Sequence, residues 1–172
     1  MVIVTGVPRS GTSMVMQTLF YLRFPVFGIP HPPNRESLMQ VSEKPFWEHY
    51  ETLNGDVSLL RGSDCAVKVE LRKALKYVQL DSNVDKVILC ERDINLLIKS
   101  QVTWNIARSS DRALKLITQS YEKFQGWIGE TPSLVVNFDN AIINPHSTVA
   151  AIAAFVGTTL DQTDAINNIE VA

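Results

Sequence analysis

The chain has 172 residues, of which 45% are hydrophobic and 20% are charged, and its formal net charge is -2. This length suits one domain over residues 1–172 with a substantial buried core, and the composition excludes a disordered chain. The charge argues against a general nucleic-acid binder. No apolar run approaches the ~20 residues that cross a bilayer. The N-terminal apolar run breaks at Gly6 and Pro8, unlike that of a signal peptide, so we expect a cytoplasmic protein.

Short apolar runs, rich in Val, Ile and Leu and without alternation, recur along the chain as buried parallel strands do. They lie at Val2–Thr5, Ala66–Glu70, Lys86–Cys90 and Leu134–Phe138. A weaker candidate for a fifth strand is Pro25–Gly28, which contains both proline and glycine.

Apolar residues at helical spacing fill the intervals between these runs. One stripe extends from Leu114 to Ile128, and Asn144, Pro145 and Gly157 are start and stop signals of a later helix. The polar tail after Asp161 is expected to fray. The alternation of strand and helix predicts an α/β fold, a parallel sheet of about four to five strands with helices on both faces.

The segment from Gly6 to Ser13 reads G-V-P-R-S-G-T-S and has the G-x-x-x-x-G spacing of a P-loop. Its glycines let the backbone turn and approach a ligand, so that the N–H groups of the loop and of the next helix point at an anion. Thr12 replaces the lysine that ordinarily follows the second glycine, and a cation stands inside the loop instead, at Arg9. A guanidinium can bind a tetrahedral oxyanion through two hydrogen bonds. The segment therefore predicts a P-loop-type sheet that binds a phosphate- or sulfate-bearing nucleotide.

A second basic position follows another predicted strand. Arg92 lies at the carboxyl end of the run that begins at Lys86, where α/β sheets bind their ligands. Ser100 comes eight residues later, on the following predicted helix. Taken alone, Arg92 is as well explained by a structural ion pair, and Ser100 by an ordinary surface position.

Together these motifs resemble the sulfotransferases that use 3′-phosphoadenosine 5′-phosphosulfate (PAPS). The resemblance implies that the loop holds the phosphosulfate group, through Pro8, Arg9, Ser10, Gly11, Thr12 and Ser13. It also implies that Arg92 and Ser100 hold the 3′-phosphate. The stretches 42–48, 53–54, 59–60, 136–140, 143–145 and 154–157 follow the family's order as well, but the family's R-K-G-x-x-G-D-W-K segment has no counterpart.

The resemblance also implies a catalytic base, at the carboxyl end of the predicted strand Ala66–Glu70. Ala66–Leu71 is similar to the stretch I-K-T-H-L, and Glu70 occupies the position of the catalytic histidine. In this interpretation Glu70 takes the proton of the acceptor, and Arg9 stabilises charge on the leaving phosphate. The alternative is a plain ion pair of Glu70 with a neighbouring cation, namely Lys68, Arg72 or Lys73.

Other polar and aromatic residues are weaker candidates. His31, Glu48 and His49 are candidates for the acceptor pocket, with surface roles at least as well supported, and we expect His146 to be exposed. Trp104 and Trp127 are expected to pack in the core or at an interface. Two cysteines, Cys65 and Cys90, are expected to be buried free thiols, because a metal site needs more ligands at closer spacing.

The resemblance implies a metal-independent enzyme that moves a sulfuryl group from PAPS to a hydroxyl or amine and releases adenosine 3′,5′-bisphosphate (PAP). The acceptor would be a small molecule or a carbohydrate, with no nucleic acid, and a homodimer stays open. Two alternatives remain. One is a P-loop kinase of a small metabolite or nucleoside, and the other is a catalytically silent nucleotide-binding module.

Overall fold

A computed structural model describes residues 1–29, 52, 55–60, 62–80, 83–159 and 161–170. Within them lies a five-stranded sheet in the order β2-β3-β1-β4-β5, and all neighbouring strands are parallel. The strands are β1 (Val2–Gly6), β2 (Val26–Phe27), β3 (Ala66–Glu70), β4 (Lys86–Glu91) and β5 (Ser133–Asn137). The prediction of a parallel sheet is confirmed, and the weak fifth candidate is a two-residue strand at one edge.

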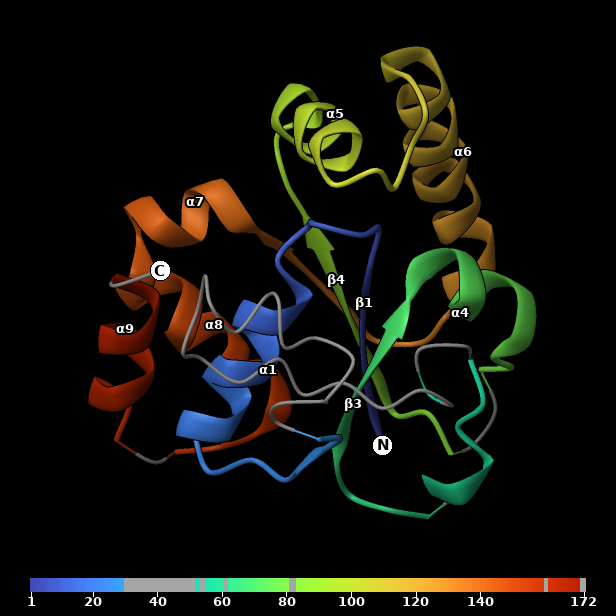
Figure 1. Cartoon of the computed structure of the whole chain (residues 1–172). Coiled ribbons are helices and arrows are strands. Elements are labelled where there is room, and N and C mark those ends of the chain that lie inside the picture. The colour runs from blue at the N-terminus through green and yellow to red at the C-terminus, as the bar shows by residue number, and fades with distance from the viewer. Residues whose placement is uncertain (30–51, 53–54, 61, 81–82, 160, 171–172) are drawn as a thin grey trace.

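Helices cover both faces of this sheet, as predicted (Figure 1). In the described residues they are α1 (Thr12–Tyr21), α4 (Leu71–Tyr77), α5 (Ile94–Thr103), α6 (Ser110–Ile128), α7 (Phe138–Ile143), α8 (Pro145–Val156) and α9 (Thr163–Glu170), with a short 3-10 turn η2 (Ser58–Leu60). Asn144 precedes α8, Pro145 is its first residue, and Gly157 ends it in a left-handed conformation, which confirms the predicted boundaries. No helix among the described residues is long and apolar enough to cross a membrane.

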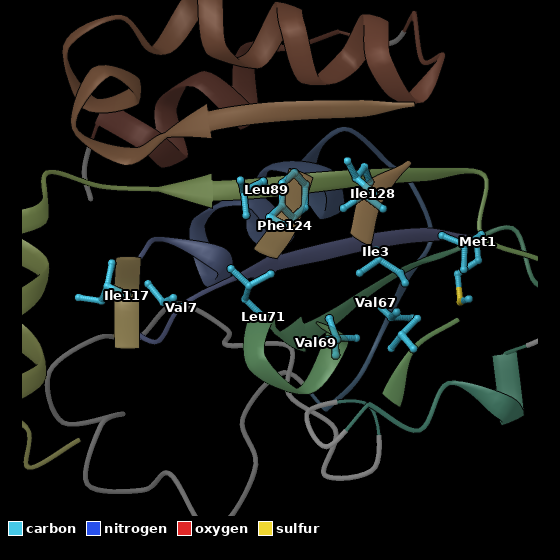
Figure 2. Packing of buried hydrophobic residues seen from close by; sticks show 14 of the residues in the cluster. Met1, Ile3, Val7, Val67, Val69, Leu71, Leu89, Ile117, Phe124 and Ile128 are labelled. Carbon is cyan, nitrogen blue, oxygen red and sulfur yellow. The ribbon is translucent and has the colours of Figure 1, made fainter. Parts of the chain in front are cut away.

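One face of the sheet packs against α4 and α6. Figure 2 shows Ile3, Val67 and Leu89, from three adjacent strands, with Phe124 of α6 beside Leu89 and Ile117 of α6 beside Val7 in the same cluster. The other face carries the alternate strand residues, among them Val4 and Ile88, and packs against α1 and α8, beside which α9 lies. Residues of one strand thus serve both faces, which explains why the strands are apolar throughout rather than alternating.

Three local predictions are wrong. Residues 163–170 of the tail expected to fray instead form α9, whose Ala165 and Ile169 are fully buried in the cluster that α9 forms with α1 and α8. Phe138 does not end a strand but begins α7, since the side chain of Asn137 accepts a hydrogen bond from the Asn140 amide and caps the helix. Leu114, placed at the start of the buried stripe, is 44% exposed.

The register of the central strand brings the predicted motifs to one edge of the sheet. Gly6, at the end of β1, lies opposite Glu70 of β3 on one side and Cys90 of β4 on the other. Since all strands run in the same direction, the residues that follow β1, β3 and β4 emerge side by side. The loop that contains Arg9 and the turn that contains Arg92 are therefore neighbours.

Candidate functional site

Both glycines of the loop between β1 and α1 are required by the surrounding atoms. A Cβ at Gly6 would lie 2.8 Å from the carbonyl oxygen of Cys90. Gly11 has a φ of 101°, in the left-handed region, and a Cβ there would lie 2.6 Å from Cδ2 of Phe138. Gly11 is also the residue before the first turn of α1, where backbone N–H groups have no partner within the helix. The loop thus directs free N–H groups to the edge of the sheet.

The inside of this loop holds a hydroxyl group with unused hydrogen-bonding capacity. The Ser10 amide donates to the Val7 carbonyl at 3.1 Å, which closes the turn. The Ser10 side chain is fully buried, and its Oγ has no hydrogen-bond partner in the described part of the chain. Buried hydroxyl groups normally have a partner, so this atom is a donor that a ligand in the loop could engage.

Arg9 is exposed at the tip of the loop and contacts α5. Its Nε donates to Oγ of Ser100 at 3.1 Å, and its guanidinium carbon lies 4.9 Å from the centre of the Trp104 ring. Trp104 is 43% exposed, so it is not a core residue. A second contact from α5 holds the base of the loop, where the buried Gln101 side chain donates through Nε2 to the Pro8 carbonyl at 2.9 Å. The structure therefore brings Arg9 and Ser100 together.

Lys68 adds a cation that the sequence-based site did not include. It belongs to β3, is only 4% exposed, and donates from Nζ to Oγ of Ser13 at 3.2 Å. Its ammonium group therefore lies at the first turn of α1, next to the position where a P-loop ordinarily has its lysine. The available signal was a charged residue inside an otherwise apolar strand, because a buried lysine requires a partner or a function.

Glu70 stands at the carboxyl end of β3, beside Gly6. Its Oε1 accepts a hydrogen bond from Nε of Arg72 at 2.7 Å, and its side chain is partly buried. Of the three cations named as alternative partners, Arg72 makes this contact. The carboxylate thus lies at the edge of the sheet where the loop begins, in an ion pair.

Arg92 follows β4 and contacts α7 rather than α5. Its Nε lies 3.4 Å from Oδ1 of Asp139, and its guanidinium carbon lies 4.8 Å from the centre of the Phe138 ring. The other oxygen of Asp139 accepts a hydrogen bond from the Asp93 amide at 2.7 Å. Asp93 in turn caps α5 by accepting from the amides of Asn95 and Leu96. Among the described contacts, Arg92 thus pairs with Asp139 of α7, whereas Ser100 pairs with Arg9 of the loop. These contacts do not join Arg92 to Ser100.

Burial raises the pKa of three groups at the end of β4, namely Glu91, Cys90 and Tyr121, a residue of α6 that contacts Cys90. Desolvation raises the pKa of the Glu91 carboxyl, at the end of β4. Burial, together with the negative charge of Glu91, raises the pKa of the Tyr121 phenol, which donates to the Cys90 carbonyl at 3.4 Å. Burial also raises the pKa of the Cys90 thiol, so this free cysteine is an inert core group.

The remaining candidates lie elsewhere or outside the described residues. His31, Glu48 and His49 fall outside them, as does the stretch 42–48. Trp127 is partly buried and donates from Nε1 to the Val78 carbonyl, and His146 is exposed. In the part of the chain that the structure describes, no three His, Cys, Asp or Glu side chains gather in a way that would hold a metal ion.

No protein-family model matches the chain, and no curated protein sequence matches it significantly. Solved structures do. The sulfotransferase domain of the Synechococcus PCC 7002 olefin synthase matches with a TM-score of 0.62 and 14% identity, over 99% of this chain and 76% of that one. Retinol dehydratase in complex with androsterone and the inactive cofactor PAP matches with a TM-score of 0.55 and 14% identity, over 98% of this chain and 63% of that one. The chain therefore has the fold of the sulfotransferases.

Proposed function

We propose that residues 1–172 form a metal-independent cytoplasmic sulfotransferase domain that uses PAPS as the sulfuryl donor and a hydroxyl or amine as the acceptor. The observation that carries this proposal is the presence of cations at two neighbouring strand ends. Arg9 and Lys68 are at the loop after β1, and Arg92 follows β4. A nucleotide with anions at both its 5′ and 3′ ends matches two such positions. The fold of the chain supports the same assignment.

The residues of the loop suit the anionic end of such a nucleotide. The start of α1 offers backbone N–H groups, the buried Ser10 hydroxyl lacks a partner among the described residues, and Lys68 lies at Ser13. We assign the phosphosulfate to residues 8–13, and the 3′-phosphate to Arg92 and Ser100. When bound, PAPS would supply an activated sulfuryl group, whose S–O bond to the phosphate breaks as the acceptor oxygen or nitrogen bonds to sulfur.

The side chains then have separate tasks. Arg9 and Lys68 stabilise the negative charge on the departing phosphate. Glu70 accepts the proton of the acceptor. Arg72 holds Oε1 of Glu70, and Oε2 is the oxygen that we assign to the proton.

Binding of PAP without magnesium tests the nucleotide assignment by calorimetry. We expect a dissociation constant in the micromolar range, and Lys68→Met should weaken it by tenfold or more, since charge-assisted hydrogen bonds are among the strong ones, worth roughly 1.5–3 kcal/mol. Lys115→Met on the exposed side of α6 is the matched control and should leave affinity unchanged. No binding, or binding that requires magnesium, would overturn the proposal, and magnesium-dependent ATP binding would favour the kinase.

Turnover tests the role of Glu70. With PAPS and a panel of phenols, alcohols, amines and sugars, we expect PAP release, reduced by roughly 10²–10⁴ in Glu70→Gln with unchanged affinity for PAP. Glu130→Gln, in the exposed turn that follows α6, is the control. If the parent protein binds PAP tightly but transfers sulfate to none of the acceptors, the silent-module alternative gains support.

A further inference from the structure

The first two residues of α7 contact both of the segments assigned to the nucleotide. The Phe138 ring packs against Gly11, where it leaves no room for a Cβ, and the same ring lies under the guanidinium of Arg92. Asp139 is its neighbour in sequence and contacts Arg92 as well. We call Phe138 and Asp139 the α7 bracket.

Asp139 holds one particular side of Arg92. Its Oδ1 lies 3.4 Å from Nε, which is buried and has no hydrogen bond in the described part of the chain. Its Oδ2 accepts from the Asp93 amide at 2.7 Å, so the carboxylate also fixes the turn that follows Arg92. A guanidinium has five N–H donors in a rigid fork. With Nε facing Asp139, the terminal N–H groups of Arg92 remain for a ligand, and the side chain is 25% exposed.

The bracket is itself tied to the sheet. Asn137, the last residue of β5, lies opposite Glu91 in the register of β4 and caps α7 with its side chain. The residues that follow this pair, Arg92 after Glu91 and Phe138 after Asn137, therefore leave adjacent strands together. The position of the bracket relative to Arg92 is set by strand pairing, which is rigid compared with a loop.

We propose that Asp139 is a positioning residue for the nucleotide 3′-phosphate. By holding Nε, it orients the terminal N–H groups of Arg92 toward the ligand, while Phe138 fixes the spacing between Arg92 and the loop at Gly11. This inference rests on the proposed function, because it concerns the 3′-phosphate of the same nucleotide. Asp139 contributes no group to the ligand itself, since a carboxylate repels phosphate.

The test compares two nucleotides that differ only in the 3′-phosphate. The ratio of affinities for PAP and for adenosine 5′-phosphate measures recognition of that group, and a change that merely loosens the fold lowers both affinities without changing the ratio. Asp139→Asn keeps an oxygen for the Asp93 amide but removes the charge, and we expect the ratio to fall about tenfold. Asp161→Asn is the matched control, because Asp161 accepts from the Thr163 amide outside the site, and it should leave the ratio unchanged.

A double-mutant cycle with Arg92→Ala separates action through Arg92 from any direct effect. In that background, Asp139→Asn should lower the ratio no further. Phe138→Leu, a second variant that keeps the carboxylate, should lower the ratio in the parent background by a smaller factor. Thermal melting checks that each variant is folded.

The outcomes distinguish the two proposals. Equal losses for both nucleotides in Asp139→Asn and Phe138→Leu, or the same fall of the ratio with and without Arg92, would overturn the positioning role and leave the proposed function intact. A parent protein that binds neither nucleotide would overturn the proposed function, and the positioning role with it.

Discussion

Arg9 adopts a left-handed backbone conformation with a φ of 76°. For a residue other than glycine this costs on the order of 1 kcal/mol or more, and such strain persists where the surroundings impose it. Here the side chain is held by Ser100 of α5 and by Trp104, the residue that follows α5, and the turn is closed between Val7 and Ser10. The loop thus holds backbone strain at Arg9, the residue that we assign to the phosphosulfate.

Gly11→Ala should destabilise the protein by about 2–4 kcal/mol, because the new Cβ would need a left-handed backbone and would also clash with Phe138. Gly157→Ala is the matched control, since Gly157 has a φ of 84° but open space around its Cβ position. Strain alone should cost about 1 kcal/mol there. Equal losses in urea unfolding of the two variants would show that the Phe138 contact is unimportant.

Glu91→Gln should stabilise the protein at neutral pH and change nothing in acid. Burial raises the pKa of Glu91, so the folded state favours the protonated carboxyl. Below the ordinary pKa of about 4.3 the group is neutral in both states. As pH rises through the raised pKa, the wild type loses stability that the glutamine variant keeps. Between pH 4 and pH 8, the melting temperature of the variant should rise above that of the wild type by a difference that grows with pH and reaches no more than about 3 °C. A difference that does not change with pH would contradict the prediction.

At the level of single residues, the spacing of motifs makes Arg9, Arg92 and Ser100 candidates for the site, but it does not point to Lys68 or Asp139. A motif marks residues at fixed separations along the chain. Lys68 donates to Ser13, which is 55 residues away in the sequence, and Asp139 accepts from the Asp93 amide, which is 46 residues away. Such pairs depend on the strand order, which local patterns do not encode.

At the level of elements, α5 is the support of the loop. Ser100, Gln101 and Trp104 all contact the segment Pro8–Arg9. The start of α5 is fixed by the Asp93 cap, which is connected through Asp139 to α7. One helix thus joins the loop after β1 to the turn after β4.

Gln101→Met should cost about 1–2 kcal/mol in unfolding free energy, because it leaves the Pro8 carbonyl without its donor. It should also weaken PAP binding several-fold, since the base of the loop is no longer held. Gln125→Met, on the exposed face of α6, is the control for the same change of residue type. Unchanged stability and affinity would show that the loop holds its shape without α5.

The elements were predicted best where apolar periodicity was strong. The strands were predicted because buried parallel strands are continuously apolar. The helix α9 was not predicted, since its sequence T-D-A-I-N-N-I-E is mostly polar and contributes only two fully buried apolar residues, Ala165 and Ile169. The start of α7 was missed because the Asn137 cap follows a strand without any intervening loop.

At the level of the whole molecule, two cores lie on opposite faces of one sheet. The face that carries α1 is completed by α9, which packs beside α1 and α8 (Figure 1). Because α1 begins at the loop that we assign to the phosphosulfate, the last described helix supports the helix that starts at the proposed site.

Ile169→Ala should destabilise the protein by about 2–5 kcal/mol, the usual cost of this change in a packed core. Ile143→Ala is the matched control, because Ile143 is 76% exposed, and it should change stability by no more than about 0.5 kcal/mol. Chemical denaturation measures both. A small effect at Ile169 would mean that α9 is not part of the cooperative unit.

The contact between Arg9 and Trp104 has an optical consequence. Any anion that draws the guanidinium away from α5 removes a cation from the face of an indole ring. We therefore expect the emission of Trp104 to change when an anion occupies the loop, and a variant with Trp104 replaced separates this signal from that of Trp47 and of Trp127, which is hydrogen-bonded to the Val78 carbonyl. An indole ring thus lies against the loop that we assign to the nucleotide, and binding to that loop is testable by fluorescence without a label.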